Sequence, residues 1–90
     1  MILLSYDISD NKLRTRFSKY LTKFGHRIQY SVYEIDNSDR VLENIMLNIE
    51  DNFGHLFAET DSVMICKIKN ECDIIKYGFV AHEDEDVLIV

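Results

Sequence analysis

The chain has 90 residues, with 16 Asp and Glu against 10 Lys and Arg, and its formal net charge at pH 7 is −6. A chain of this length holds one compact domain, so tandem domains and repeat arrays are excluded. No apolar run approaches the ~18 residues of a membrane span, and the N-terminus lacks the basic start of a signal peptide. We therefore expect a cytoplasmic protein that does not associate with membranes.

Basic and acidic residues are concentrated in different halves of the chain. Residues 1–34 carry six basic and three acidic residues, whereas residues 35–90 carry four basic and thirteen acidic ones. This asymmetry indicates an anionic partner on one surface and a basic protein partner on another. With three glycines and no proline, the chain has no Gly-rich loop for a nucleotide phosphate, which excludes P-loop and dinucleotide-binding folds.

The first expected element is a buried strand over residues 2–6, an apolar run that stops at Asp7. An amphipathic helix follows, capped by Ser9 or Asp10. Gly25 is expected to end this helix by adopting the left-handed backbone conformation.

Residues 12–27 carry all six basic side chains of the first 34 residues, with no acid among them. Four of them recur at spacings that place them in one line beside the buried face, which predicts a cationic ridge. The alternative is a solvated helix face that happens to be basic. The candidate nucleic-acid ligands are Lys12, Arg14, Arg16, Lys19, Lys23 and Arg27, of which Lys12, Arg16, Lys19 and Lys23 form the ridge.

The middle and C-terminal parts of the chain alternate strand and helix patterns. In chain order we expect one long strand or a bulged hairpin over 27–35, a turn-and-cap cluster over 36–39, a helix over 41–53 closed near Gly54, and strands over 62–68, 74–80 and 87–90. We place Cys66 in a strand core and expect both it and Cys72 to be inert thiols.

This order predicts an α+β fold, a ferredoxin-like split β-α-β sandwich with two helices on one antiparallel sheet and a C-terminal edge strand. Residues 1–80 would form the ferredoxin-like domain. Residues 81–90 would provide an acidic linker and a strand for dimer or partner contact. That last strand would add to its own sheet or to the sheet of a second copy.

Asp7 is the leading candidate for chemistry, because a carboxylate at a strand tip has no packing role. It could hold Mg²⁺, which usually takes one or two carboxylates and keeps several waters. One chain offers few ligands, so such a site would need a dimer whose axis passes near Asp7. The alternative is that Asp7 and Asp10 only cap the N-terminus of the helix, where the helix dipole favours acidic residues.

Other polar candidates are weaker. Ser31 has no general base beside it in the sequence, and Ser/His/Asp chemistry cannot be argued from one serine. The tyrosines Tyr6, Tyr30 and Tyr33 could stack on nucleic-acid bases or pack the sheet, and packing is the favoured interpretation.

Three segments together resemble a known family at matching spacing. They are Tyr6–Asp10 (YDISD), Leu13–Arg16 (LRTR) and Gly25–Glu34 (GHRIQYSVYE). They resemble the small CRISPR-associated endoribonuclease family, which supplies the non-integrase subunit of the spacer-acquisition complex. The similarity covers about the first 40 residues closely, and the remainder by length and element order.

The resemblance implies a ferredoxin-like homodimer in which two copies of Asp7 share a Mg²⁺ for phosphodiester hydrolysis. Family residues around that site map onto Tyr6, Arg14, Arg16, Arg27, Ser31 and Tyr33. The position of Tyr33 is usually Phe, so an apolar and interfacial role is expected for its ring. Arg14 and Arg16 lie two apart on a helix and so cannot both contact one phosphate.

The resemblance also implies a function that needs no catalysis. Two such subunits, flanked by integrase dimers, form a platform for a double-stranded DNA protospacer, with RNA as the other nucleic-acid substrate to consider. The acidic linker over 83–86 would meet a basic integrase surface while 87–90 docks by strand addition. The alternative is a stand-alone RNA-binding or toxin-like ferredoxin-fold module without an integrase.

Overall fold

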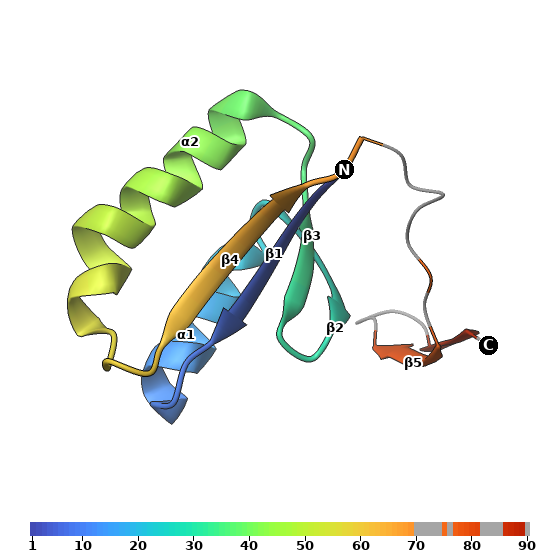
Figure 1. Ribbon diagram of the computed structural model, residues 1–90, viewed down its shortest axis with the longest axis horizontal. Coiled ribbons are helices and arrows are strands. Elements are labelled where there is room, and N and C mark those ends of the chain that lie inside the picture. Colours follow the sequence, from blue (N-terminus) through green and yellow to red (C-terminus); the bar gives the residue numbers. More distant parts are fainter. Residues whose placement is uncertain (70–74, 76, 82–85, 90) are drawn as a thin grey trace.

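The computed structural model describes residues 1–69, 75, 77–81 and 86–89 (Figure 1). The elements in chain order are β1 (Ile2–Asp7), α1 (Asn11–Leu21), β2 (Gly25–Gln29), β3 (Val32–Ile35), α2 (Asp39–Asn48), a π-helical turn (Ile49–Phe53), a short 3₁₀ turn (Gly54–Leu56), β4 (Ser62–Lys67), β5 (Gly78–Ala81) and β6 (Asp86–Ile89). No helix in the described part of the chain is long and apolar enough to cross a membrane.

The main sheet has four strands in the order β2-β3-β1-β4, and every neighbouring pair is antiparallel. Each helix connects two strands that are separated in the sheet by a third strand, which is the split β-α-β arrangement. The predicted α+β ferredoxin-like fold with two helices on one sheet is therefore confirmed.

Both helices cover the same face of the sheet, and no helix of the described residues covers the opposite face (Figure 1). On β1 the buried residues Ile2, Leu4 and Tyr6 alternate with Leu3, Ser5 and Asp7, as strand geometry requires. The core is completed by the inner faces of the helices and by β3. Its other buried members are Ile8, Leu13, Phe17, Leu21, Tyr33, Ile35, Leu42, Ile45 and Phe53.

Helix α1 begins where the sequence predicts and ends for a different reason. The Asp10 carboxylate accepts a hydrogen bond from the Leu13 backbone N–H at 2.8 Å, which caps the helix. The helix ends at Leu21, and Gly25 is the first residue of β2. A Cβ at Gly25 would lie 2.9 Å from the Ile35 Cα and collide with the Glu34 carbonyl. The expected left-handed helix end at Gly25 is wrong, because the glycine is needed for close strand pairing.

Residues 25–35 form a hairpin, which decides between the two predicted alternatives. Arg27 pairs with Tyr33 and Gln29 with Val32, and the register shifts between these two pairs. The bulged hairpin is therefore confirmed and the single long strand is wrong. The Tyr6 backbone N–H donates to the Ser31 carbonyl at 3.0 Å, which ties the hairpin turn to β1.

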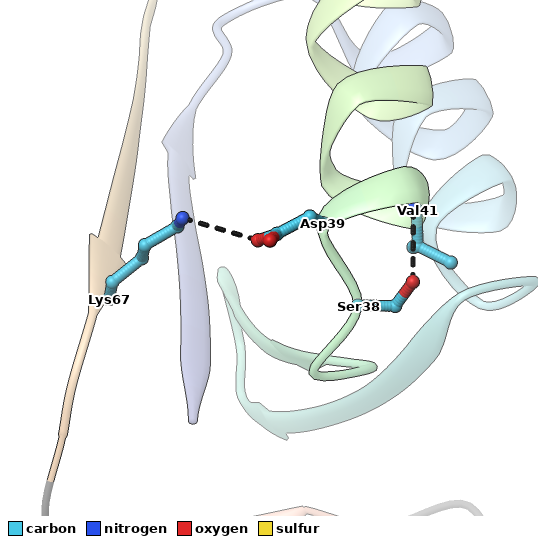
Figure 2. A network of polar contacts seen from close by, with 4 residues as sticks. All are labelled: Ser38, Asp39, Val41 and Lys67. Carbon is cyan, nitrogen blue, oxygen red and sulfur yellow. Dashed lines mark hydrogen bonds and ion pairs between the residues drawn. The ribbon is translucent and has the colours of Figure 1, made fainter.

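Helix α2 is anchored at its N-terminus, as Figure 2 shows. The Ser38 hydroxyl accepts a hydrogen bond from the Val41 N–H at 3.4 Å, and the Lys67 ammonium on β4 lies 3.4 Å from the Asp39 carboxylate. Both charged side chains are exposed, so the ion pair adds little stability. The helical path continues beyond the expected end at Gly54, through the π-helical and 3₁₀ turns to Leu56.

The C-terminal strands form a second, two-stranded sheet in which β5 pairs with β6, and β5 lies beside β2. Within this chain β6 does not join the main sheet as an edge strand. Of the predicted strands over 74–80 and 87–90 and the acidic linker, residues 74, 76, 82–85 and 90 lie outside the described residues.

The predicted burial of Cys66 is wrong. Its side chain is exposed on β4, because it points to the sheet face that no helix covers. Cys72 lies outside the described residues.

Candidate nucleic-acid interface

The sheet separates the predicted site residues into two groups. Alternation along β1 points Tyr6 toward the helices and Asp7 to the opposite face. Tyr33 and Arg27, paired across the hairpin, share the face of Tyr6. Asp7 therefore does not belong to the cluster formed by Tyr6, Arg27 and Tyr33.

Asp7 is exposed at the end of β1, directly opposite Ser62 of β4. Within the described residues, no group of three or more His, Cys, Asp or Glu side chains could hold a metal ion. A single exposed carboxylate supplies only part of what Mg²⁺ needs, since this ion commonly binds through one or two carboxylates and retains several waters. Asp7 could therefore supply one carboxylate ligand, and the described residues of one chain group no further ligands with it.

Asp61 is a residue beside this strand end that the sequence reasoning missed. Its carboxylate accepts hydrogen bonds from the backbone N–H and hydroxyl of Ser9, at 2.9 and 3.0 Å, and from the Ala58 N–H at 2.8 Å. These bonds, with those from the backbone N–H groups foremost, lower the pKa of Asp61 below its ordinary value. No local pattern marks this residue, because its main partner is 52 positions away.

The ridge predicted on the first helix is exposed along its length. Lys12, Arg16 and Lys19 lie on α1 and Lys23 on the turn after it, and all four side chains are solvent-accessible. No acidic residue occurs in α1. The ridge is therefore a continuous cationic surface with no carboxylate from its own helix to neutralise it.

Arg14 and Arg16 point in different directions, as their spacing predicts. The guanidinium of Arg14 donates to the Ile8 carbonyl at 2.9 Å and also bonds the Asn11 side chain. Arg14 thus fastens the connection between β1 and α1, whereas Arg16 is exposed to solvent. Only Arg16 belongs to the ridge.

A hydrogen-bonded cluster of Ser18, Arg27 and Tyr33 lies between α1 and the hairpin. The Ser18 and Tyr33 hydroxyls are 2.5 Å apart. The Arg27 Nη2 donates to the Ser18 hydroxyl at 2.8 Å and to the Tyr33 hydroxyl at 3.3 Å. The guanidinium also lies 5.6 Å from the centre of the Tyr33 ring. The hydrogen bond to Tyr33 is the main cause that raises the pKa of Arg27, so this side chain stays charged.

Ser18 was not predicted as a site residue. It is only 9% exposed, on the flank of the apolar stripe of α1. A small polar residue beside Phe17 and one turn before Leu21 is the sequence signal that could have identified it.

The tyrosines separate into buried and exposed members. Tyr6 and Tyr33 are core residues whose rings stack at 6.3 Å, and burial is the main cause that raises the pKa of Tyr6. The packing interpretation is therefore confirmed for these two. Tyr33 is 1% exposed, which leaves its ring no surface for the expected interfacial role. Tyr30, by contrast, is 69% exposed at the hairpin turn.

An open pocket of about 350 Å³ lies between α1 and the hairpin. Three of the residues around it are cationic and six carry hydroxyl groups, and none is an Asp or Glu. Its lining consists of Tyr6, Arg14, Thr15, Ser18, Lys19, Thr22, Arg27, Tyr30 and Tyr33. Ser31 does not line this pocket, and its carbonyl instead holds the hairpin turn to β1.

The second helix and the turns after it are mainly acidic. Arg40 lies in the first turn of α2, and residues 41–66 contain no Lys or Arg. The acidic side chains Glu43, Glu50, Asp51 and Glu59 are all exposed along α2 and the turns that follow it. On one sheet face the helix layer therefore presents the cationic α1 and, with α2 and the turns after it, a segment whose exposed charges are mainly acidic.

Comparisons with known proteins identify the relatives of this chain. The chain is 34% identical over 77 residues to a CRISPR-associated endoribonuclease Cas2 of Mycobacterium tuberculosis, covering 86% of this chain and 65% of that protein. A relative of the same name from Rhodospirillum rubrum is 33% identical over 72 residues, which cover 79% of this chain and 55% of the relative. The chain thus spans somewhat less than two thirds of the length of these relatives.

A Cas2 protein of Methanospirillum hungatei matches at 28% identity, over 98% of this chain and 97% of its own length. The crystal structure of a hypothetical protein from Thermus thermophilus has the same fold, with a TM-score of 0.65 at 23% identity, covering 99% of this chain and 95% of that one. The family model described as CRISPR associated protein Cas2 matches residues 1–74. The chain therefore belongs to the Cas2 family of CRISPR-associated proteins.

Proposed function

We propose that this chain is a non-catalytic, duplex-binding subunit of a CRISPR spacer-acquisition complex, working as a homodimer beside an integrase. The observation that carries this proposal is the exposed ridge of Lys12, Arg16, Lys19 and Lys23, which follows a helix that contains no acidic residue. Such a surface neutralises phosphates without reading bases, which is what a measuring platform for double-stranded DNA requires.

The acidic surface of α2 supports a single orientation for the duplex. A phosphate backbone is repelled by Glu43, Glu50 and Asp51 and attracted by the ridge on the neighbouring helix. The nucleic acid therefore lies along α1, and the anionic surface stays available for a basic protein such as the integrase.

The uncovered sheet face supports the homodimer. Met64 is 64% exposed on this face, and Leu3 and Val32 are only half-buried on the strands beside it. A second copy packed on this face removes that apolar surface from water and brings the two Asp7 carboxylates toward one axis. In this assembly residues 81–90 contact the integrase or the other protomer.

The test is charge reversal on the ridge outside the pocket. The variant Lys12→Glu/Lys23→Glu should lose about tenfold or more in duplex affinity and should flatten the salt dependence, since fewer counterions are released. The matched control is Arg40→Glu, which reverses an exposed charge on α2 and should bind the duplex normally.

Spacer acquisition in cells provides the second readout. We expect the ridge variant to block acquisition and Asp7→Ala to leave it intact. The opposite pattern would reject the platform. Failure of the protein to co-purify with any integrase would favour the alternative, a stand-alone RNA-binding module.

A second candidate function is Mg²⁺-dependent phosphodiester hydrolysis, favoured by the exposed strand-end Asp7 and by the endoribonuclease name of the relatives. In this function Asp7 and its symmetry mate would hold Mg²⁺, which would supply Lewis-acid chemistry for the attack of water on a phosphodiester. Asp7→Asn should abolish cleavage of RNA or DNA by highly purified protein. Unchanged cleavage would identify a contaminating nuclease and remove this candidate.

A further inference from the structure

We propose that the pocket between α1 and the hairpin is a binding site for one phosphate group. Arg27 is its principal ligand, and the hydroxyls of Ser18 and Tyr33 hold the Arg27 guanidinium in place. The inference deepens the proposed function, because it rests on a nucleic-acid role for this face. It differs from duplex binding along the ridge, because the pocket takes a single group rather than a run of phosphates.

The charge of the lining argues for an anion. Arg14, Lys19 and Arg27 line the pocket and no carboxylate is among its lining residues, so the lining carries a net positive charge. The other lining residues carry hydroxyl groups, which can donate to phosphate oxygens. The pocket volume of about 350 Å³ lies within the range of about 300–1,000 Å³ that is common for small-molecule sites.

Arg27 is held in advance of binding. Its Nη2 bonds both hydroxyls, and its guanidinium lies over the Tyr33 ring, so the planar group cannot turn freely. Holding the guanidinium in this way reduces the conformational entropy that a ligand would otherwise have to remove. Because the side chain is half-buried, its charge acts with less screening than a surface lysine.

Arg27 also has donor capacity that the protein leaves unused. Its Nε–H is buried and has no acceptor among the described residues. A buried donor without a partner is rare in folded proteins and calls for an explanation, such as a bound anion or water. The Nε atom is closed to solvent, so an oxyanion in the pocket would contact it only after a shift of the guanidinium.

Tyr33 explains why this chain can hold Arg27 so firmly. Its hydroxyl contacts both Ser18 and Arg27. Ser18 and Tyr33 are therefore positioning residues that act through Arg27. Tyr30, exposed at the edge of the pocket, offers a ring on which the base of a nucleotide can stack.

The experiment is calorimetric titration of the full chain with inorganic phosphate, a nucleoside monophosphate and the unphosphorylated nucleoside. We expect the monophosphate to bind more tightly than phosphate, and the nucleoside to bind weakly or not at all. Absence of binding by both phosphate and the monophosphate would overturn the proposal.

Two oligonucleotides of one sequence, with and without a terminal phosphate, identify the source of the phosphate group. Tighter binding of the phosphorylated strand identifies a nucleic-acid end as the ligand. Equal binding of the two strands, with the monophosphate still bound, identifies a free nucleotide. Both results support the pocket.

Variants separate positioning from simple structural support. Tyr33→Phe and Ser18→Ala should each weaken monophosphate binding about fivefold, the effect of one hydrogen bond. Arg27→Ala should weaken it more, and adding Tyr33→Phe to Arg27→Ala should change nothing further, because the hydroxyl acts through the guanidinium. Arg40→Ala, which removes one positive charge far from the pocket lining, should bind normally.

Thermal unfolding of each variant checks that the domain is folded. If Ser18→Ala does not fold, the comparison of Tyr33→Phe, Arg27→Ala and their double variant still tests the positioning role. Full additivity of Tyr33→Phe with Arg27→Ala would overturn the positioning role. Monophosphate binding could be absent while the ridge variant Lys12→Glu/Lys23→Glu still loses duplex affinity. That result would reject the phosphate site in the pocket and leave the proposed duplex binding along the ridge supported.

Discussion

Helices α1 and α2 occupy the same face of the sheet and differ mainly in what they show to solvent. They have 11 and 10 residues, each begins with a side-chain cap, and each buries an apolar stripe. The exposed face of α1 is cationic without an acid, whereas α2 and the turn after it expose mainly acids. The comparison teaches that burial constrains only the inner face of each helix, which leaves the outer face free to select a partner.

The largest expected loss of stability comes from truncating a buried side chain on the inner face of either helix, which tests whether both faces belong to one core. Phe17 of α1 is fully buried against Tyr6 and Phe53, and Ile45 of α2 is fully buried as well. Phe17→Ala should lower the free energy of unfolding by about 3–5 kcal/mol and Ile45→Ala by about 2–5 kcal/mol. Urea unfolding measures both. A small loss at either position would show that its helix is not part of one common core.

A smaller loss of stability is expected when the N-terminal cap of either helix is removed. The Asp10 cap is short, at 2.8 Å, and the Ser38 cap is longer, at 3.4 Å. Replacing either residue by Ala should cost about 0.5–2 kcal/mol, with the larger loss at Asp10. Thermal unfolding ranks the two variants, and the reverse order would contradict the geometry. Lys67→Ala, which removes the exposed pair with Asp39, is the control and should change stability by less than about 1 kcal/mol.

The smallest effect concerns the tether at the start of α1. Asp61 has a lowered pKa because its carboxylate accepts bonds from Ser9 and Ala58, so its contribution is complete above the ordinary pKa of Asp, about 4. That contribution is lost as the pH falls through the lower pKa of the folded state. The stability difference between wild type and Asp61→Asn should therefore be constant near neutral pH and shrink on acidification below about pH 4. A difference that grows in acid would contradict this assignment.

Much of the fold was predictable because amphipathic patterns are local. The spacing of Leu13, Phe17 and Leu21 identifies α1, and the apolar run before Asp7 identifies β1. Cys66 was misplaced because the pattern of β4 does not say which of its two faces the helices cover. Gly25 was correctly singled out, but for the wrong reason. A glycine is required there because the backbone of the neighbouring strand leaves no room for a Cβ, not because the helix ends there.

Several members of the candidate site were predictable, but Ser18 and the grouping of the residues were not. Strand alternation alone separates Tyr6 from Asp7, yet the resemblance places both around one site. Pairing Arg27 with Tyr33 depends on the hairpin turn and on the register shift before Gln29, which the sequence left open. Ser18 becomes part of the site only because α1 packs over that pair.

The sequence by itself determined the order of helices and strands, the apolar face of each helix and the separation of basic from acidic residues, since all three follow from the spacing of neighbouring residues. Only the tertiary structure decided that Asp7 lies on one face of the sheet and the cationic pocket on the other. It also decided that the Tyr33 hydroxyl holds Arg27 and that Asp61 holds Ser9. These contacts join residues distant in the chain, and their geometry is set by strand register and helix packing, which no local pattern encodes.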